Sequence, residues 1–455
     1  MARDQPWYDR RLADKYSRRL KEQLYQEPRE ALPVIVMLKN GVGLRDEEIY
    51  QCVCKFGGVV HRQLPVIGGF SALVPIRVLA EIGPHEKVRR VHLDRRVHTC
   101  LDIAIPSILA DRVQTEGHTG HGVTIAVLDS GIHPHPDFLK PASRLIGWHD
   151  VVNGRGKPYD DHGHGTHVAG IAAGNGYASD GRYRGVAPSA NLVAIKVADA
   201  EGSAPMSRVI EGLQWVLDHQ HDFKIRIVNL SLGSESSEPY KEDPLCQAVE
   251  EVWRKGIVVV VAAGNDGPTA RTIDTPGNDP YVITVGAIDD RQTKTRNDDL
   301  VPDFSSRGPT NDGLRKPDLL APGVDINAPQ TGGGYTKRTG TSMAAPFVTG
   351  AAALVLEGRP DLAPDQVKKL LRASAEDWQL SANTEGVGYL HVGQLLRLRD
   401  AKMALGRQTV KTNANVRNGS LVAAALRPTI KKKLYDMAKR YLHLPFGILI
   451  MAGLL

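Results

Sequence analysis

The stretch Gly340-Thr341-Ser342-Met343-Ala344-Ala345-Pro346 is the starting point for interpreting this 455-residue chain. A glycine turn precedes the serine, and the apolar, alanine-rich run that follows it to Leu356 predicts a helix. A serine at a helix N-terminus lies beside unpaired backbone N–H groups and the positive end of the helix dipole. These surroundings favour a nucleophile whose attack generates an oxyanion, although a lone serine there is more often a simple helix cap.

Two segments upstream supply the acid and the base that such a serine needs. The apolar, β-branched run 123–128 ends in Asp129 and a glycine turn, which predicts a buried parallel strand with this carboxylate at its carboxyl edge. His164 follows a glycine-rich lead-in and opens a small-residue run, which predicts a helix over 164–174. A serine hydroxyl needs an adjacent base at neutral pH, so the combination indicates nucleophilic catalysis, whereas a lone aspartate at a strand end is usually a turn residue.

Three motifs resemble those of subtilisin-like serine proteases (subtilases) and follow the same order. Each places small residues around one reactive side chain: Asp129-Ser130-Gly131, His164-Gly165-Thr166-His167-Val168-Ala169-Gly170 and the heptapeptide 340–346. The resemblance covers roughly residues 103–399 and implies an α/β, subtilisin-like three-layer fold with a mainly parallel sheet flanked by helices. It also implies a serine endopeptidase that works through an Asp-His-Ser triad and an acyl-enzyme intermediate.

The resemblance assigns a role to each matched residue. Ser342 is then the nucleophile, His164 the base that takes its proton, and Asp129 the group that orients the imidazole. Asn265 follows the strand-like run 256–264, and in subtilases such an asparagine donates its amide to the oxyanion; by itself it would be a plain turn residue. Loss of this donor lowers turnover about 10²–10³-fold in subtilisin itself. Because the chain keeps all four residues, an active enzyme is favoured over the alternative, a catalytically silent subtilase fold used for binding or regulation.

Substrate contacts are expected at two further strand ends. In subtilases one small-residue edge pairs with the substrate backbone, and a second forms a wall of the main specificity pocket. The matching residues are Ser231, Leu232, Gly233, Ala263 and Gly264. Their small size leaves the pocket open, which favours an apolar or aromatic side chain before the scissile bond. Asp274 lies in the loop that closes this pocket in the family: pointing inward it would favour a basic side chain, and otherwise it is a turn residue.

The order of predicted elements agrees with this fold. Apolar strand-like runs alternate with helix-like runs, which predicts a parallel α/β sheet with helices on both faces. Strands are expected over 122–129, 191–197, 225–233, 256–263 and 281–287, and helices over 107–115, 164–174, 205–221, 243–255 and 342–357. We assign residues 101–400 to this peptidase domain. His162 and His167 flank the proposed base; by motif register we interpret neither of them as the base, and we interpret His167, one turn along the helix, as structural.

Residues 31–100 predict a separate small domain, preceded by a charged N-terminal extension, residues 1–30. Its elements follow the order β-α-β-β-α-β of a ferredoxin-like α+β fold. They are expected over 34–38, 44–56, 58–64, 70–74, 77–82 and 88–97. The order resembles the inhibitory propeptide of subtilases, which implies a self-inhibited zymogen whose own propeptide domain is an intramolecular inhibitor and is cut off between Arg96 and Ile105. The alternative is a permanently attached accessory domain.

The positive charge of the chain is concentrated in its tail, residues 401–455. The tail contains ten Lys or Arg and one acid, whereas the whole chain carries +6, so residues 1–400 carry −3. A basic stretch at helical spacing (431–441) precedes an apolar end (444–455), which predicts peripheral contact with an anionic membrane. The alternatives are a disordered tail or one docked on the protease; nucleic-acid binding is disfavoured because stacking aromatics are not interleaved.

The remaining composition bears on location, metals and partners. Residues 1–30 lack the apolar core of a secretory signal, and no run reaches the ~18 apolar residues that span a bilayer. Four cysteines are too few for a disulfide framework and lack zinc-ligand spacing. These features predict a cytoplasmic protease acting on proteins and peptides, with non-classical export as an option because subtilases are mostly exported. The chemistry requires no cofactor; a structural calcium is an option, with Asp137 as a candidate ligand.

Overall fold

The computed structural model describes residues 15–17, 20–21, 24, 31–44, 46–55, 57–94, 96–99, 107–291 and 296–400, with backbone only for 80, 96–99 and 297. The chain divides into two units, Met1–Arg399 and Asp400–Leu455, and everything below concerns the first. The basic tail 401–455 and residues 100–106, which hold most of the expected cleavage interval, lie outside the described residues.

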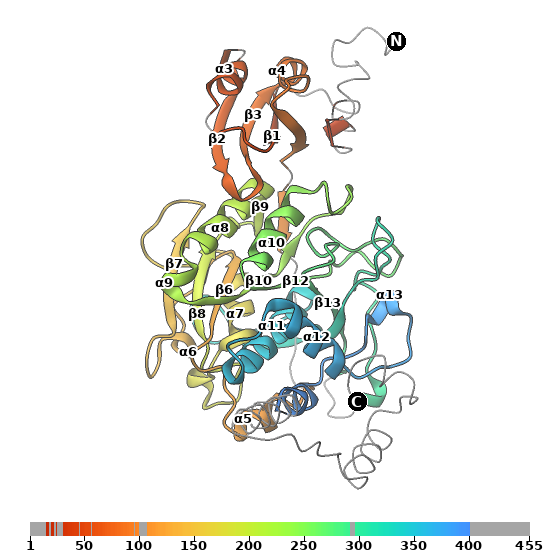
Figure 1. The fold of residues 1–455 in the computed structure, drawn as a ribbon. Helices are drawn as coiled ribbons and strands as arrows, with labels where there is room; N and C mark the ends of the chain where they lie inside the picture. Colours follow the sequence, from red (N-terminus) through yellow and green to blue (C-terminus); the bar gives the residue numbers. More distant parts are fainter. Residues whose placement is uncertain are drawn as a thin grey trace, which may run out of the picture. The chain divides into compact units, whose positions relative to one another are not determined.

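A seven-stranded parallel sheet forms the centre of the larger domain (Figure 1). Its strand order is β14-β13-β12-β10-β6-β8-β7. The strands are β6 (Thr124–Asp129), β7 (Leu145–Asp150), β8 (Asn191–Lys196), β10 (Ile225–Leu230), β12 (Val258–Ala262), β13 (Ile283–Ile288) and β14 (Leu319–Pro322). The sequence pattern predicts the five inner strands, because strands buried on both faces are continuous apolar runs. It does not predict the two edge strands, since β7 is only partly buried and β14 has four residues.

Helices flank this sheet in the predicted alternation. α7 and α11 pack against each other, and α8 packs against α10. The longer helices are α7 (His164–Ala173), α8 (Met206–Asp218), α10 (Pro244–Arg254), α11 (Thr341–Gly358) and α12 (Pro364–Ser374), and the shorter ones are α5 (Ala110–Thr115), α6 (Pro136–Leu139), α9 (Gln220–Phe223) and α13 (Ala382–Glu385). The helix expected over 205–221 starts later, because Pro205 ends a short strand, β9 (Ser203–Pro205). α12 was not predicted from the sequence.

A second, antiparallel sheet lies in residues 31–93, with strand order β2-β3-β1-β4. Its elements are β1 (Ala31–Leu38), α3 (Glu47–Lys55), β2 (Val59–Leu64), β3 (Gly69–Pro75), α4 (Ile76–Ile82) and β4 (Val88–Leu93). This is the ferredoxin-like arrangement that the element order predicts. The small sheet and its two helices enclose a hydrophobic core of their own, separate from the core of the larger domain.

The surroundings of strand β1 explain why its sequence is almost entirely apolar. A half-exposed strand would alternate apolar and polar residues, but nearly all of β1 is buried. Val34 and Val36 belong to the core beneath α3 and α4, whereas Ile35 and Met37 belong to the core of the larger domain. Both faces of the small sheet are therefore covered, one by its own helices and the other by the larger domain.

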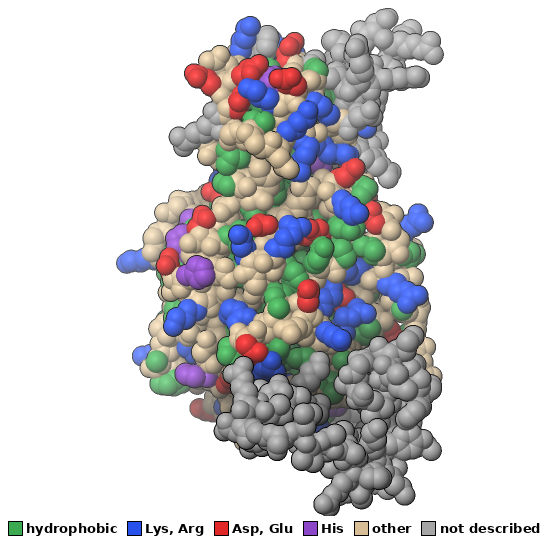
Figure 2. Space-filling model, viewed as in Figure 1, with side chains coloured by type: hydrophobic (Ala, Val, Ile, Leu, Met, Phe, Trp, Pro, Cys, Tyr) green, Lys and Arg blue, Asp and Glu red, His purple; other side chains and the backbone are tan. Residues whose placement is uncertain are grey.

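Among the described residues, one helix is long and apolar enough to cross a membrane, and it is α11. The helix is 89% buried within the protein, as is usual for the central helix of a globular domain. Acidic and basic side chains are interspersed over the face that Figure 2 shows. This distribution agrees with the small net charge of residues 1–400.

Candidate active site

Asp129 and His164 form the first part of the site. All six residues of β6 are buried, and Asp129 ends this strand at the carboxyl edge of the sheet, where parallel α/β sheets bind ligands. His164 is the first residue of α7, and its Nδ1 lies 2.7 Å from Oδ1 of Asp129. Both side chains are fully buried. The bond at Nδ1 fixes the orientation of the imidazole ring, because the partner of one ring nitrogen sets the protonation state of the other.

Close backbone packing holds this pair in place. A Cβ atom on Gly165 would lie 2.1 Å from the carbonyl oxygen of Gly131 and 2.9 Å from Cβ of Asp129, so only glycine fits after the histidine. The backbone N–H of Ser130 donates to Oδ1 of Asp129 at 2.7 Å, and the N–H of Gly165 donates to the Ser130 hydroxyl at 2.9 Å. The start of α7 is therefore fastened to the end of β6.

Asp160, which the sequence analysis did not single out, strengthens the same junction. Its buried carboxylate accepts the backbone N–H groups of Gly163 (2.7 Å) and Thr166 (2.9 Å) at the start of α7. It also accepts the hydroxyl of Ser130 at 2.8 Å. A carboxylate there satisfies orphan N–H groups and complements the helix dipole. The feature of the sequence that could have revealed Asp160 is the position of an acidic residue four places before His164.

Lys196 is a buried cation beside β6, the strand that ends in Asp129. Its Nζ donates to the carbonyl oxygens of Ser130 (2.7 Å) and Ala198 (2.9 Å) and to the carboxylate of Asp161 (2.5 Å). In the β6–β8 pairing, Lys196 is the direct partner of Asp129. A lysine at the end of an apolar strand normally reaches solvent, so the sequence carries no signal for this role.

Ser342 is the second residue of α11 and is fully buried. Its hydroxyl donates to the carbonyl oxygen of Ser231 at 3.0 Å, and the Ser231 hydroxyl donates to the carbonyl oxygen of Ser342 at 2.9 Å. Pro346 has no N–H for the carbonyl four residues before it, which leaves the Ser342 carbonyl free to accept this bond. Ser231 follows β10, the neighbour of β6, so Ser342 lies at the same sheet edge as Asp129.

Asn265 lies next to this serine, three residues after β12. Its Oδ1 accepts the backbone N–H of Thr341 at 2.9 Å, which orients the amide. Its Nδ2 is shielded from solvent and has no hydrogen-bond partner among the described residues. A buried, unpaired amide nitrogen is costly unless a ligand uses it. The arrangement offers a preplaced donor beside Ser342.

An extended segment of the chain lies against the predicted substrate-binding edge. Strand β5 (Arg96–Thr99) pairs antiparallel with β11 (Leu232–Gly233) on one side and with β9 (Ser203–Pro205) on the other. Thr99 is opposite Leu232, one residue from Ser231. A peptide backbone therefore fits between these two edges and runs toward Ser342.

The other predicted substrate contacts lie beside the same edge. Ala263 and Gly264 follow β12, the neighbour of β10, and both are buried. Gly264 has a φ of +107°, and a Cβ there would lie 2.7 Å from Oδ2 of Asp274, so only glycine fits. Asp274 itself is 6% exposed. The structure thus brings Asp129, His164, Ser342, Asn265, Ser231, Leu232, Gly233, Ala263 and Gly264 to one edge of the sheet.

Comparison with known proteins identifies the family. The Peptidase S8 profile, described as the subtilase family, matches residues 120–392. The chain belongs to the subtilase family. The serine protease AprX of Bacillus subtilis (strain 168) is 46% identical over 330 residues, which are 68% of this chain and 74% of AprX. Subtilisin E of the same strain is 35% identical over 327 residues, which are 70% of this chain and 78% of subtilisin E.

A solved structure of a subtilase relative bears out the fold. Fervidolysin from Fervidobacterium pennivorans, described as a keratinolytic enzyme related to subtilisin, matches with a TM-score of 0.65 and 23% identity. The match covers 81% of this chain and 61% of fervidolysin, so the chain spans about three fifths of that protein. The predicted subtilisin-like fold is confirmed, and the chain is a serine endopeptidase by family.

The two histidines that flank His164, His162 and His167, have different surroundings. His167 is fully buried, and its Nε2 donates to the carbonyl oxygens of Ile326 (2.9 Å) and Thr336 (3.1 Å), which fastens α7 to the hairpin of β15 (Ile326–Pro329) and β16 (Tyr335–Arg338). Burial lowers the pKa of His167 to about 3. The ring of His162 lies 6.2 Å from that of His164, and burial lowers its pKa.

Asp137, the candidate calcium ligand, is already engaged. Its buried carboxylate accepts the hydroxyl of Tyr335 at 2.9 and 3.0 Å and the backbone N–H of Ala178 at 2.9 Å. A calcium ligand must offer oxygen lone pairs to the ion, but two hydrogen-bond donors already occupy those of Asp137. The Asp137 carboxylate therefore does not fit the role of a calcium ligand. The part of the chain that the structure describes contains no group of three or more His, Cys, Asp or Glu that could hold a metal.

Proposed function

We propose that this subtilase cleaves peptide bonds with Ser342 as nucleophile, His164 as base and Asp129 as the group that orients the base. The observation that carries the proposal is the buried, unpaired Nδ2 of Asn265 beside Ser342. A donor that has no partner in the resting protein is what an oxyanion needs, because it costs no reorganisation during the reaction. A catalytically silent fold would have no use for this group.

The proposed reaction follows from the hydrogen bonds at rest. At rest, Ser342 Oγ donates to the Ser231 carbonyl oxygen at 3.0 Å. Rotation of the serine side chain would bring its proton to Nε2 of His164, since such bonds often tighten only with substrate present. Oγ then attacks the peptide carbonyl, Asn265 Nδ2 and the Ser342 N–H hold the oxyanion, and His164 returns the proton to the leaving amine. Water releases the acyl group by the same steps in reverse.

We further propose that residues 31–100 inhibit the enzyme in a latent precursor. Strand β5 occupies the position that we assign to substrate, between β9 and β11. Asp94, just before this strand, accepts the backbone N–H of Ser207 at 2.9 Å and also its hydroxyl, in the first turn of α8. A carboxylate at a helix N-terminus is stabilising and would anchor the strand at its amino side.

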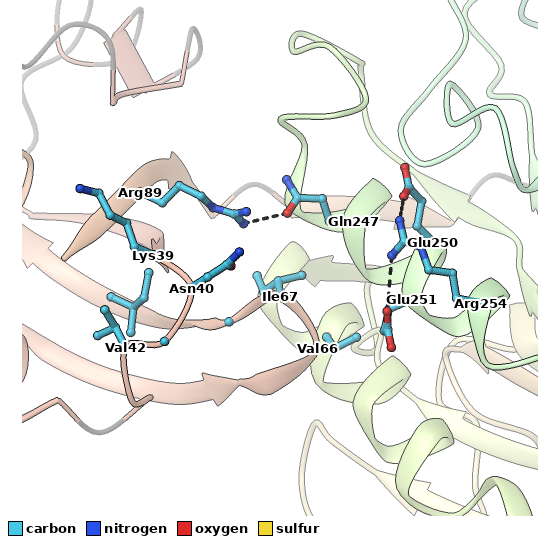
Figure 3. Close-up of a pocket in the computed structure, with 13 residues that line it drawn as sticks. Lys39, Asn40, Val42, Val66, Ile67, Arg89, Gln247, Glu250, Glu251 and Arg254 are labelled. Atoms are coloured by element: carbon cyan, nitrogen blue, oxygen red, sulfur yellow. Dashed lines mark hydrogen bonds and ion pairs between the residues drawn. The ribbon is translucent and has the colours of Figure 1, made fainter. Parts of the chain in front are cut away.

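Contacts between the small domain and the larger one support this inhibitory docking. Arg90 pairs with Glu242 at 2.5 Å and Glu238 at 3.3 Å, and Arg62 pairs with Glu211. The tip Pro65–Ile67 packs against α8 and α10. Arg89 donates to Gln247 at 2.8 Å beside a crevice of about 420 Å³ that Figure 3 shows between the small domain and α10. The ion pairs of this interface are partly exposed and therefore individually weak, which would ease the later release of an inhibitor.

Labelling with a fluorophosphonate tests the proposed chemistry. We expect the purified protein to be labelled and to hydrolyse a peptide substrate, and Ser342→Ala to abolish both. Ser143→Ala, which changes an exposed serine, is the matched control and should leave both unchanged. Absence of labelling in processed protein would favour the silent fold.

The Ser342→Ala chain also tests the latent precursor. We expect wild-type protein to lose its N-terminal domain and the Ser342→Ala chain to remain intact. N-terminal sequencing should place the new terminus after Thr99 and no later than residue 105, because β5 is paired as far as Thr99. Processing of the Ser342→Ala chain alone would show that the cut is not autocatalytic.

We propose a cytoplasmic location, with peripheral membrane contact through residues 401–455. The three cysteines within the described residues, Cys52, Cys54 and Cys246, are free, which suits a reducing compartment. Liposome flotation of the full chain against a chain that ends at Asp400 tests the membrane contact, and equal flotation would exclude it. The proposed chemistry needs no metal; a structural calcium would have to bind away from Asp137, and unchanged thermal stability in a chelator would exclude it.

A further inference from the structure

A chain of buried hydrogen bonds leads through the interior of the protein to Ser342. Thr349 lies seven residues, or about two helical turns, after Ser342 in α11, and its hydroxyl donates to Oδ1 of Asn229 at 2.7 Å. Asn229 belongs to β10, against which α11 packs (Figure 1), and its Nδ2 donates to the Ser231 hydroxyl at 2.9 Å. The Ser231 hydroxyl donates in turn to the carbonyl oxygen of Ser342 at 2.9 Å. All four residues are fully buried.

The Ser342 carbonyl sets the direction of this chain of bonds. Pro346 lacks the N–H that would reach this carbonyl in a regular helix, and the Ser231 hydroxyl supplies a donor instead. A side-chain amide has a donor end and an acceptor end, and turning Asn229 over would exchange them. The Ser231 proton would then go to Asn229, and the buried Ser342 carbonyl would lose this donor, which is costly. Thr349 opposes the turn, because its hydroxyl donates to the acceptor end of the amide as it stands.

These bonds hold the backbone of Ser342 and leave its side chain able to rotate. Ser342 Oγ donates to the Ser231 carbonyl oxygen at 3.0 Å, so these two residues exchange two hydrogen bonds. In the proposed reaction Oγ turns from this carbonyl toward His164, and rotation of one side-chain bond is sufficient while the backbone is held. A displaced first turn of α11 would move Oγ relative to both His164 and Nδ2 of Asn265. Small errors in such a geometry lower reaction rates strongly.

We propose that Thr349 and Asn229 are positioning residues for the nucleophile of this subtilase. Both act through Ser231, whose hydroxyl holds the backbone of Ser342 at the start of α11. The inference rests on the proposed function, in which Ser342 attacks the substrate. It gives Ser231 a task beyond the predicted substrate contact: the strand that follows this residue, β11, pairs with an extended backbone, whereas the hydroxyl serves Ser342.

Variants of Thr349 in processed protein test the proposal. Thr349→Val keeps the size of the side chain but leaves Oδ1 of Asn229 without the threonine donor, which it can replace only by taking the Ser231 proton away from Ser342. We expect kcat and the rate constant of fluorophosphonate labelling to fall together, about tenfold, the effect of one hydrogen bond, with KM within about twofold of wild type. Thr349→Ser keeps the hydroxyl and should retain more than about half of both rates.

A second background tests whether Thr349 acts through Ser231. In a Ser231→Ala chain the hydroxyl that transmits the effect is gone, so adding Thr349→Val should lower the labelling rate less than about twofold further. A substitution that only loosened the packing would lower the rate about tenfold in both backgrounds. Thr124→Val is the control, because it removes the hydroxyl of a buried threonine at the amino end of β6, at the opposite edge of the sheet, and should leave both rates unchanged.

Thr349→Ala removes the same donor without placing a second methyl group in the interior, so it gives the comparison even where the valine chain does not fold. Wild-type rates in Thr349→Val or Thr349→Ala, no recovery in Thr349→Ser, or a further tenfold loss in the Ser231→Ala background would each overturn the proposal. Labelled wild-type protein whose rate does not depend on the Thr349 hydroxyl refutes only this inference. Wild-type protein that is neither labelled nor active refutes the proposed function, and this inference with it.

Discussion

The proposed cleft has a fixed side and a removable side. On the fixed side, Asp129 and His164 are fully buried, and Asp160 and Lys196 tie their strand and helix together through buried hydrogen bonds. On the removable side, β5 follows the small domain, residues 31–93. The ion pairs between this domain and the larger one are partly exposed, and an open crevice lies beside them.

The difference shows how rigidity is distributed in this protein. Catalytic groups must be held close to the reactive geometry, which requires buried and satisfied partners around them. An inhibitor that is later released needs the opposite, and partly exposed ion pairs are individually weak and screened by salt. Substitutions on the two sides should therefore differ both in size and in what they change.

The largest effect is expected at the buried pair. Asp129→Asn keeps the shape of the side chain but lets the imidazole adopt the wrong tautomer, so kcat should fall about 10⁴-fold. Steady-state hydrolysis of a peptide substrate measures the effect, with circular dichroism to confirm folding. A loss below tenfold would mean that the pair is not part of the catalytic machinery.

A smaller effect is expected at Asn265. Asn265→Ala removes the unpaired amide nitrogen, and kcat should fall about 10²–10³-fold with KM nearly unchanged, because the donor acts on charge that forms only in the transition state. Asn153→Ala, which removes an exposed amide, serves as the control. A rise in KM at constant kcat would instead assign Asn265 to substrate binding.

The stability of the fixed side should depend on pH through His167. Its Nε2 donates to two carbonyl oxygens, and its buried Nδ1 has no partner among the described residues, so the folded protein cannot accommodate a second proton. Burial lowers the pKa of His167 in the folded protein to about 3. The contribution of neutral His167 to the free energy of unfolding is therefore complete above the pKa of the unfolded chain, ~6.5. This contribution is lost as pH falls from ~6.5 toward the pKa of the folded protein.

Thermal or urea unfolding of the Ser342→Ala chain, which cannot digest itself, measures this contribution. Below pH ~6, the free energy of unfolding should fall with decreasing pH in both chains. The fall should be steeper, by about 1.4 kcal/mol per pH unit, in the chain that keeps His167 than in a His167→Gln chain. Parallel pH profiles for the two chains would show that His167 does not titrate in this way.

The smallest effect is expected on the removable side. Ile67→Ala removes apolar contact between the small domain and the larger one, worth about 1–2 kcal/mol. In the Ser342→Ala chain, amide exchange in β5 and β11 should then accelerate about tenfold, since the domain opens more often. Val59→Ala, at a residue that is 53% exposed, is the control. Unchanged exchange in Ile67→Ala would show that this contact does not hold β5 in the cleft.

Much of this arrangement follows from the sequence alone. The five inner strands are continuous apolar runs because both of their faces are buried, and the order of elements in residues 31–93 matches the small sheet as observed. Asp129, His164, Ser342 and Asn265 stand in short motifs of small residues, because close backbone approach around them excludes larger side chains. Local chemistry of this kind leaves a signal in the sequence.

Only the tertiary structure decided which distant groups lie beside the site residues and support them. Lys196 is next to Asp129 because the sheet order places β8 beside β6, and nothing in its own neighbourhood indicates that it is buried. The buried Asp274 packs against two glycines from separate strand ends, Gly233 and Gly264, and no local pattern in the sequence predicts these neighbours. A sequence records which residues are small, apolar or charged, but the packing of strands and loops determines which side chain each of them meets.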